Sequence, residues 1–269
     1  MTLALTNQNY HSNEANREYM SVSQFKDFTT CEASALAKLN GEYTDIDSDA
    51  LLLGSYVHAH FEGVLDQFRI DNPQLFLSKG DRAGQLYEKY SIADRMIEAL
   101  ERDSFCSFVL QGEKETIITA ELGGIAWKAK IDVLNREQER FADIKTVRDI
   151  YGRHWSNEHG AWVSFVEHYR YVLQMAVYAE LVRLSSGLDY WYEPAIVAVS
   201  KEKVPAIEVI GGFDTRIALE LDLMKERLPR VIAVKSGAEE PRRCERCSYC
   251  RSTRQVSGMV HYMDLLIGS

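Results

Sequence analysis

Apolar residues recur every three or four positions along several stretches of the chain, and this spacing predicts amphipathic helices. We expect helices over residues 21–39, 49–64, 92–102, 158–186 and 214–235. Ser21 or Ser23 is suited to cap the first helix, and Gly187 is suited to end the fourth. Residues 1–18 are polar, so we expect this segment to be loosely held.

In the middle of the chain the period changes to an alternation of apolar and polar residues, which is typical of half-buried strands. We expect strands over residues 115–122, 125–134, 140–146, 195–200 and 206–210. Gly123-Gly124 suits a tight hairpin turn, so the first three strands form an antiparallel meander and the last two form a further pair. Helices then flank a central mixed sheet, and the predicted fold class is an α/β sandwich.

The chain has 269 residues, a length that suits a single domain over residues 1–269. We expect a core over about residues 20–210 and a C-terminal segment, 211–269, with a helix and a cysteine cluster. The net charge of −9 does not point to nucleic acid, although carboxylates that hold a metal ion are compatible with DNA. Charges interrupt every apolar run, and residues 1–13 lack the features of a signal peptide, so we expect a cytoplasmic protein.

Two carboxylates and a lysine are placed to converge on one face of the meander. Asp143 and Lys145 are two residues apart, so on a strand their side chains point to the same face. Asp132 precedes the intervening turn, and the hairpin brings it beside this pair. Carboxylates chelate Mg²⁺, which activates water and polarises phosphate, while Lys145 can stabilise the developing charge. The alternative is that these are surface charges on a half-exposed hairpin.

Further metal ligands are available around this group. His58 lies on the helix before the meander and can join the coordination, and Glu62, one turn later, can support it. The backbone carbonyl of Ile144 is another candidate. The expected ligands are therefore His58, Asp132, Asp143 and Ile144. His60 is expected to point elsewhere.

Gln174 and Tyr178 lie one turn apart on the long helix that follows the Asp143 strand, so they share one face. Gln174 can hydrogen-bond phosphate or a catalytic side chain. Tyr178 can stack on DNA or hold Lys145. The alternative is an amphipathic pair that faces the core.

Taken in order, these residues resemble the PD-(D/E)XK nuclease superfamily. The branch with exonuclease VIII (RecE) and the RecB-type nuclease domains carries a helical Gly-x-x-x-His, a strand Asp, an Asp-x-Lys and a helical Gln-x-x-x-Tyr. The corresponding residues here are Gly54 with His58, Asp132, Asp143 with Lys145, and Gln174 with Tyr178. The segments Ser21-x-Ser23-x-Phe25 and Cys31-Glu32-Ala33 are similar to phage and prophage RecE-like proteins.

This resemblance implies a restriction-endonuclease-like core and an exonuclease that hydrolyses duplex DNA from its ends, 5′ to 3′, with Mg²⁺ or Mn²⁺. It also implies a RecT-type single-strand annealing protein as partner in phage-type recombination, and a homo-oligomer that encloses DNA. Two alternatives remain open: a Cas4-like nuclease that acts on single-stranded DNA, and a non-catalytic module that binds DNA ends or protein partners.

Three cysteines near the C-terminus, Cys244, Cys247 and Cys250, have the spacing of iron–sulfur ligands. A [4Fe–4S] cluster needs a fourth cysteine, and Cys31 is the best candidate. Nucleases of the AddB and Cas4 types resemble this plan, with one cysteine before the core and three after it. Zinc, or free thiols without a metal, are the alternatives. Cys106 lies among apolar residues, so we expect it to be a core thiol.

Overall fold

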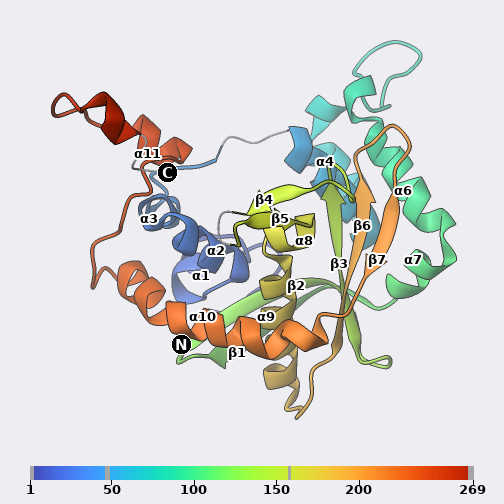
Figure 1. Ribbon diagram of the computed structural model, residues 1–269. Coiled ribbons are helices and arrows are strands. Elements are labelled where there is room, and N and C mark those ends of the chain that lie inside the picture. The colour runs from blue at the N-terminus through green and yellow to red at the C-terminus, as the bar shows by residue number, and fades with distance from the viewer. Residues whose placement is uncertain (1–2, 46–48, 157–158, 266–269) are drawn as a thin grey trace.

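The computed structural model describes residues 3–45, 49–156 and 159–265. A five-stranded mixed sheet forms its centre, in the order β1-β2-β3-β6-β7, and β4 pairs with β5 apart from it (Figure 1). The strands are β1 Glu113–Leu122, β2 Ile125–Asn135, β3 Arg140–Val147, β4 His154–Ser156, β5 Ala161–Val163, β6 Glu193–Ser200 and β7 Ile207–Ile210. Paired strands are antiparallel except β3 and β6, which are parallel. The predicted α/β fold with its three-stranded meander is confirmed.

Helices cover both faces of the central sheet (Figure 1). The α-helices are α1 Asn13–Glu18, α2 Val22–Thr30, α3 Glu32–Asn40, α4 Asp49–Glu62, α5 Leu65–Asp71, α6 Ile92–Arg102, α7 Ser104–Val109, α8 Phe165–His168, α9 Tyr171–Ser186, α10 Asp214–Lys235 and α11 Ser248–Ser252. Short 3₁₀ turns span Pro73–Leu75, Glu88–Tyr90 and Tyr262–Leu265. The helices predicted over residues 92–102 and 214–235 have the bounds that the apolar spacing indicates.

Two apolar cores lie on opposite faces of the sheet. The larger core packs α2, α9 and α10 against strand residues such as Trp127 and Phe141. The smaller core packs α4, α6 and α7 against residues such as Ile144 and Val197. Because both faces of β3 and β6 are covered, most residues of the two strands are buried, and β6 is apolar along most of its length. Polar side chains on β3 therefore need partners inside the fold.

The helix expected over residues 21–39 is divided at Cys31. Ser21 caps α2 as predicted, because its hydroxyl accepts from the Gln24 amide. Cys31 then adopts an extended conformation, with φ −158° and ψ 104°, between α2 and α3. The apolar spacing continues through this point, so the periodicity alone does not reveal the break. The kink turns the Cys31 thiol toward the C-terminal segment.

The helix expected over residues 158–186 begins much later than predicted. Residues 157–158 lie outside the described residues, and β5 and α8 occupy the stretch that follows. Arg170 then takes a left-handed conformation, with φ 56°, and α9 starts at Tyr171. The Ser164 hydroxyl accepts from the Glu167 amide, so a separate cap starts α8. Gly187, with φ 65°, ends α9 as expected.

The N-terminal segment, expected to be loose, packs onto the sheet where it is described. Tyr10 and Ala15 are buried, and residues 13–18 form α1. The Lys128 ammonium donates to the Tyr10 carbonyl and, at 2.8 Å, to Asn16 Oδ1. The segment is therefore held by a buried lysine of β2, a contact that polar composition does not predict.

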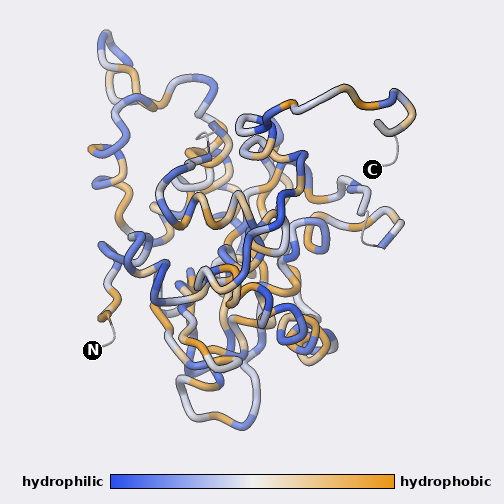
Figure 2. The backbone as a smooth tube through the Cα atoms, turned by 90° about the vertical axis from the view of Figure 1, so that its left-hand side faces the viewer, coloured by the Kyte–Doolittle hydropathy of each residue, from blue (hydrophilic) through white to orange (hydrophobic). Residues whose placement is uncertain are grey.

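The C-terminal tail leaves the body of the protein after α11 (Figures 1 and 2). Several of its apolar side chains are exposed: Val256, Met259, Val260, Tyr262 and Met263. Across the described ranges, no helix has both the length and the apolar composition that a membrane crossing requires.

The turn between β1 and β2 predicts a difference between two neighbouring glycines. Both have positive φ, 64° at Gly123 and 80° at Gly124, as a type I′ turn requires. A Cβ at Gly123 would lie 2.5 Å from Leu228 Cδ2, whereas one at Gly124 would meet nothing within 4 Å. Gly124→Ala should lower the free energy of unfolding by about 1–2 kcal/mol from backbone strain alone. Gly123→Ala should lower it by about 2–4 kcal/mol, because Leu228 must also move.

Urea denaturation of the two variants and the parent measures this difference. Equal losses at both positions would show that α10 does not press on the turn.

Candidate functional site

The site opens where β2 and β3 part. Their ladder contains three residue pairs, from Asn135 with Arg140 to Val133 with Ala142, whereas β3 stays paired with β6 along its whole length. Asp132 is the first residue of β2 beyond this ladder. Its Oδ2 accepts from the Ile144 amide at 2.7 Å, so a carboxylate takes the place of a strand carbonyl. The gap between the strands is thus lined by acidic oxygen atoms.

Asp143 and Lys145 form a buried ion pair on β3. Lys145 Nζ lies 2.5 Å from Asp143 Oδ2, and Gln174 Nε2 donates to Asp143 Oδ1 at 2.7 Å. Asp143 is 3% exposed, so its two oxygens depend on these partners rather than on water. The structure therefore places Gln174 on a catalytic candidate, which is one of the two roles expected for it.

His58 reaches Asp132 from α4. Its Nδ1 lies 3.4 Å from Asp132 Oδ2, and a third of its side chain is exposed. Helix α4 can approach β3 because residue 54 is glycine: a Cβ there would lie 3.0 Å from Thr146 Oγ1. The Gly-x-x-x-His spacing thus has a physical reason, since the glycine allows the close packing that brings His58 to the strand. His60 faces away and contacts Glu101 at 2.7 Å, as expected.

Glu115 is a potential ligand that the sequence reading left without a role. The pairs Lys114 with Val133 and Thr116 with Ile131 place it opposite Asp132 on β1. Its φ is 50°, a left-handed conformation, and its side chain is largely buried against Lys130. Ligand atoms of His58, Glu115 and Asp132 all lie within 4.8 Å of one another. One imidazole nitrogen and two carboxylates suit Mg²⁺ or Mn²⁺.

The alternation of β2 side chains between the two faces of the sheet is interrupted at Asp132. Ile131 packs in the larger core and Val133, two residues later, packs in the smaller one. In a regular strand these two side chains would share a face. The irregularity falls on Asp132 and on Glu115 opposite it. Both carboxylates are therefore presented at a local distortion of the hairpin.

Burial and neighbouring charges shift the pKa values of the ionisable groups in the site. Burial raises the pKa of Asp132 to about 6, and repulsion from Asp143 adds to this, while His58 and Lys145 oppose it. Burial lowers the pKa of Lys145, but attraction to Asp143 and Asp132 outweighs burial, so the net shift is upward. Burial also raises the pKa of Glu62, and the Glu115 charge contributes. The raised pKa keeps the lysine charged, whereas the raised pKa values of Asp132 and Glu62 make these carboxylates harder to ionise.

Lys26 and Tyr171 complete the buried side of the site, and the sequence reading missed both. The Tyr171 ring contacts two ammonium groups, with its centroid 4.6 Å from Lys145 Nζ and 5.1 Å from Lys26 Nζ. Lys26 donates to the Tyr169 carbonyl at 3.0 Å. Burial lowers the pKa of Lys26 to about 7, and repulsion from Lys145 adds to the effect. Only the long-range packing of α2 on α9 brings Lys26 here.

Tyr178 does not have the place that was expected for it. It lies on α9 one turn beyond Gln174, but it is half-buried against the larger core, with its ring 6.4 Å from that of Phe141. Burial raises the pKa of its phenol well above the usual value. Tyr178 is not among the residues that line the cleft. It hydrogen-bonds Gln174, whereas Tyr171 contacts Lys145.

The site opens into a cleft of about 1080 Å³. His58, Glu115, Asp132, Ile144 and Lys145 line it, whereas Asp143 lies beneath them. Its rim also carries basic and aromatic side chains: Arg148, Tyr169, Tyr171 and Lys201. The cleft thus joins a cation-binding acidic group to positive charges that suit phosphates.

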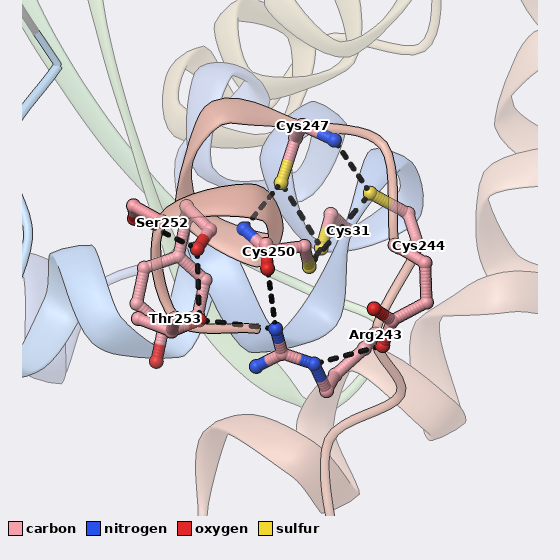
Figure 3. Close-up of polar contacts among 9 residues, drawn as sticks. Cys31, Arg243, Cys244, Cys247, Cys250, Ser252 and Thr253 are labelled. Atoms are coloured by element: carbon pink, nitrogen blue, oxygen red, sulfur yellow. Dashed lines mark hydrogen bonds and ion pairs between the residues drawn. The ribbon is translucent and has the colours of Figure 1, made fainter. Parts of the chain in front are cut away.

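The four expected cysteines converge elsewhere, between the α2–α3 junction and α11 (Figure 3). Cys31 Sγ lies 3.5 Å from Cys250 Sγ and 3.8 Å from Cys247 Sγ. Cys244 Sγ lies 3.9 Å from Cys250 Sγ. Cys106 is separate and buried, as expected.

Comparisons with known proteins bear on this arrangement. Residues 21–253 match a family described as a PDDEXK-like domain of unknown function (DUF3799). The crystal structure of a "Putative exonuclease" from Eubacterium rectale is similar, with a TM-score of 0.91 and 38% identity over 99% of this chain and 100% of that chain. The crystal structure of SSO0001 gives a TM-score of 0.30 at 14% identity over 85% of this chain and 91% of that one. No curated protein matches significantly.

The group of His58, Glu115 and Asp132 predicts which side chains bind a divalent cation. Asp132→Asn and Glu115→Gln keep the shape of the side chains but remove a charge from the group. Each should weaken Mn²⁺ binding, measured by isothermal titration calorimetry, by about tenfold or more, since even indirect supports of metal ligands have effects of that size. Glu121→Gln, on the exposed part of β1, is the matched control. Unchanged Mn²⁺ affinity in Glu115→Gln would remove Glu115 from the ligand set.

Proposed function

This chain belongs to the PDDEXK-like domain family DUF3799, and we propose from this that it is a metal-dependent exodeoxyribonuclease that hydrolyses phosphodiester bonds at duplex DNA ends. Membership, together with the similarity to the Eubacterium rectale protein, confirms the predicted restriction-endonuclease-like fold. One observation carries the proposal: Asp132, Asp143 and Lys145 converge at the gap between β2 and β3. Phosphodiester hydrolysis needs this combination of acidic and basic groups in one place.

His58, Glu115 and Asp132 are the side chains that would hold the divalent cation, with the Ile144 carbonyl as a further candidate. Asp143 was expected among these ligands, but its oxygens face Gln174 and Lys145, so its first role here is to position the lysine. A bound divalent cation lowers the pKa of water and polarises a phosphoryl oxygen.

The protein side chains supply the rest of the chemistry. Lys145 Nζ has donors free to reach a phosphoryl oxygen or an attacking water, because it faces the cleft. Asp143 fixes the ammonium, and Gln174 in turn fixes Asp143. Burial of this chain of contacts keeps the lysine charged and oriented before substrate arrives.

The proposed substrate class follows from the comparison and from the order of the motifs. The Eubacterium rectale protein is described as an exonuclease, and the ordered motifs resemble the RecE branch, which implies duplex ends and 5′-to-3′ polarity. A RecT-type annealing partner and a cytoplasmic location belong to the same proposal. The exposed apolar tail supports assembly into a homo-oligomer.

A hairpin beside the cleft supports a role in nucleic-acid binding. Trp155 on β4 and Trp162 on β5 are 50% and 62% exposed, and their rings lie 5.7 Å apart. His154 connects the hairpin to the cleft wall, because its ring contacts that of Tyr169 at 5.6 Å. Exposed aromatic rings next to a phosphate-binding cleft suit the stacking of bases.

The first test of the proposed function is cleavage of end-labelled duplex DNA with and without Mg²⁺. Asp143→Asn and Lys145→Ala should each lower the Mg²⁺-dependent rate by about 10³-fold or more, because removing one residue of a cooperating catalytic group abolishes most of the activity of the whole group. His60→Ala is the matched control: it lies on α4 near His58 but contacts Glu101 outside the cleft, so its rate should not change.

The outcome separates the alternatives. Degradation of single strands with no action on duplex ends would favour the Cas4-like nuclease. DNA binding without any metal-dependent cleavage by the parent protein would favour the non-catalytic module. Near-normal cleavage by Asp143→Asn would refute the assignment of the site.

The hairpin makes a separate prediction about substrate affinity. Trp162→Ala should raise KM for DNA by about 5- to 150-fold, because one lost base stack weakens binding by about 1–3 kcal/mol. It should leave kcat nearly unchanged, since the ring is remote from Lys145. Phe105→Ala on α7, an exposed ring outside the cleft, is the control. A fall in kcat at constant KM would contradict a binding role for the hairpin.

A further inference from the structure

We infer that Cys31, Cys244, Cys247 and Cys250 bind a single zinc ion, and not the [4Fe–4S] cluster that their spacing in the sequence suggests. The inference starts from the distances between their sulfur atoms. The measured separations are 3.5, 3.8 and 3.9 Å, and all four sulfurs lie within 4.8 Å of one another (Figure 3).

These separations match the edge of a tetrahedron around one ion. Zinc bonds each thiolate at about 2.3 Å, and four ligands at that radius lie about 3.8 Å apart. In a [4Fe–4S] cluster each thiolate binds a different iron. Two such sulfurs are separated by an iron–iron edge plus two outward-pointing bonds, a span that exceeds every separation here. The cysteine set therefore encloses one ion and leaves no room for a cubane.

The backbone around the cysteines is arranged to favour thiolates. The Cys247 amide donates to Cys244 Sγ at 3.3 Å, and the Cys250 amide donates to Cys247 Sγ at 3.4 Å. Each C-x-x-C step thus closes a turn in which the first sulfur accepts a backbone hydrogen. Such bonds stabilise negative charge on sulfur, and metal binding requires that charge.

Basic residues surround the site and offset its charge. Zinc with four thiolates carries a net charge of −2. The Arg243 guanidinium donates to the Cys250 carbonyl at 2.7 Å and to Thr253 at 3.0 Å, and it also pairs with Glu245 at 2.9 Å (Figure 3). Arg242 and Arg246 lie in the same segment. This local excess of positive charge stands out in a chain whose net charge is −9.

The packing also indicates a structural role for the ion. Among the described residues, the apolar cluster that joins α11 to the α2–α3 junction has three buried members, Cys31, Ala33 and Cys250, with Cys244, Cys247 and Tyr249 partly buried against them. Besides this, Glu32 contacts Arg230 at 2.6 Å and the Arg242 amide at 2.7 Å. So small an apolar contact holds a chain end weakly, whereas a zinc tetrathiolate adds its binding free energy to the folded state. Zinc has no redox chemistry, which suits a fixed staple.

The test is the metal content of the full-length protein, purified anaerobically without chelators. Plasma mass spectrometry should find about one zinc per chain and no stoichiometric iron. The solution should be colourless. Replacement of zinc by Co²⁺ should give the strong visible bands of a tetrahedral cobalt thiolate, which no oxygen-ligated site produces. About four irons per chain with a brown colour would overturn the inference.

A matched pair of variants identifies the ligands. Cys250→Ser should lose most of the zinc and the cobalt bands, whereas Cys106→Ala, which removes the one cysteine outside the cluster, should keep both. If Cys250→Ser fails to fold, titration of the parent protein with an organomercurial thiol reagent tests whether four thiols bind the zinc. Zinc release should then be complete after modification of four thiols. Protein without zinc that takes up neither Zn²⁺ nor Co²⁺ after reduction would also refute the site. The cleavage assay tests the other centre, so the two proposals can fail independently.

Discussion

The hydrogen bond from the Ile144 amide to the Asp132 carboxylate is the contact on which the catalytic arrangement depends. An interior strand that loses its neighbour leaves buried amides without partners, at a cost of about 1–3 kcal/mol each. Here β2 leaves β3 after three pairs, and a side chain from β2 satisfies the amide that the ladder no longer reaches. The fold can therefore hold an open gap in its central sheet only because an acidic residue stands at the point of divergence.

The Asp132 carboxylate at this position repels the other carboxylates of the site, and nearby cationic groups offset part of this repulsion. Asp132, Asp143 and Glu115 crowd negative charge into a poorly solvated gap. Lys145 and His58 compensate part of it, and α9 contributes Gln174 and Tyr171 around the same pair. The carboxylates of Glu115 and Asp132, whose oxygens lie within 4.8 Å of each other, still repel one another without a cation. A divalent ion that binds there stabilises the folded state as well as the reaction.

Local patterns were enough to predict the sheet, most helices and the Asp132–Asp143–Lys145 group, because period and turn chemistry act over few residues. Glu115 was also within reach: a two-residue turn at Gly123-Gly124 fixes the register and places residue 115 opposite 132. The break at Cys31, the β4–β5 hairpin and the approach of Lys26 were not predictable in this way. They depend on contacts between segments far apart in sequence, which no local period encodes.

The two proposed metal centres lie apart in the fold but are connected by one helix. Helix α2 connects them, since Lys26 and Thr29 contact the α8–α9 region and Cys31 ends the same helix at the sulfur cluster. A displaced α2 would disturb both sites together. The ligands nevertheless differ in kind: carboxylates and imidazole at the gap between β2 and β3, thiolates at the chain end. Hard cations prefer the first and soft ones the second, so under the two proposals ligand chemistry alone would direct each ion to its own centre.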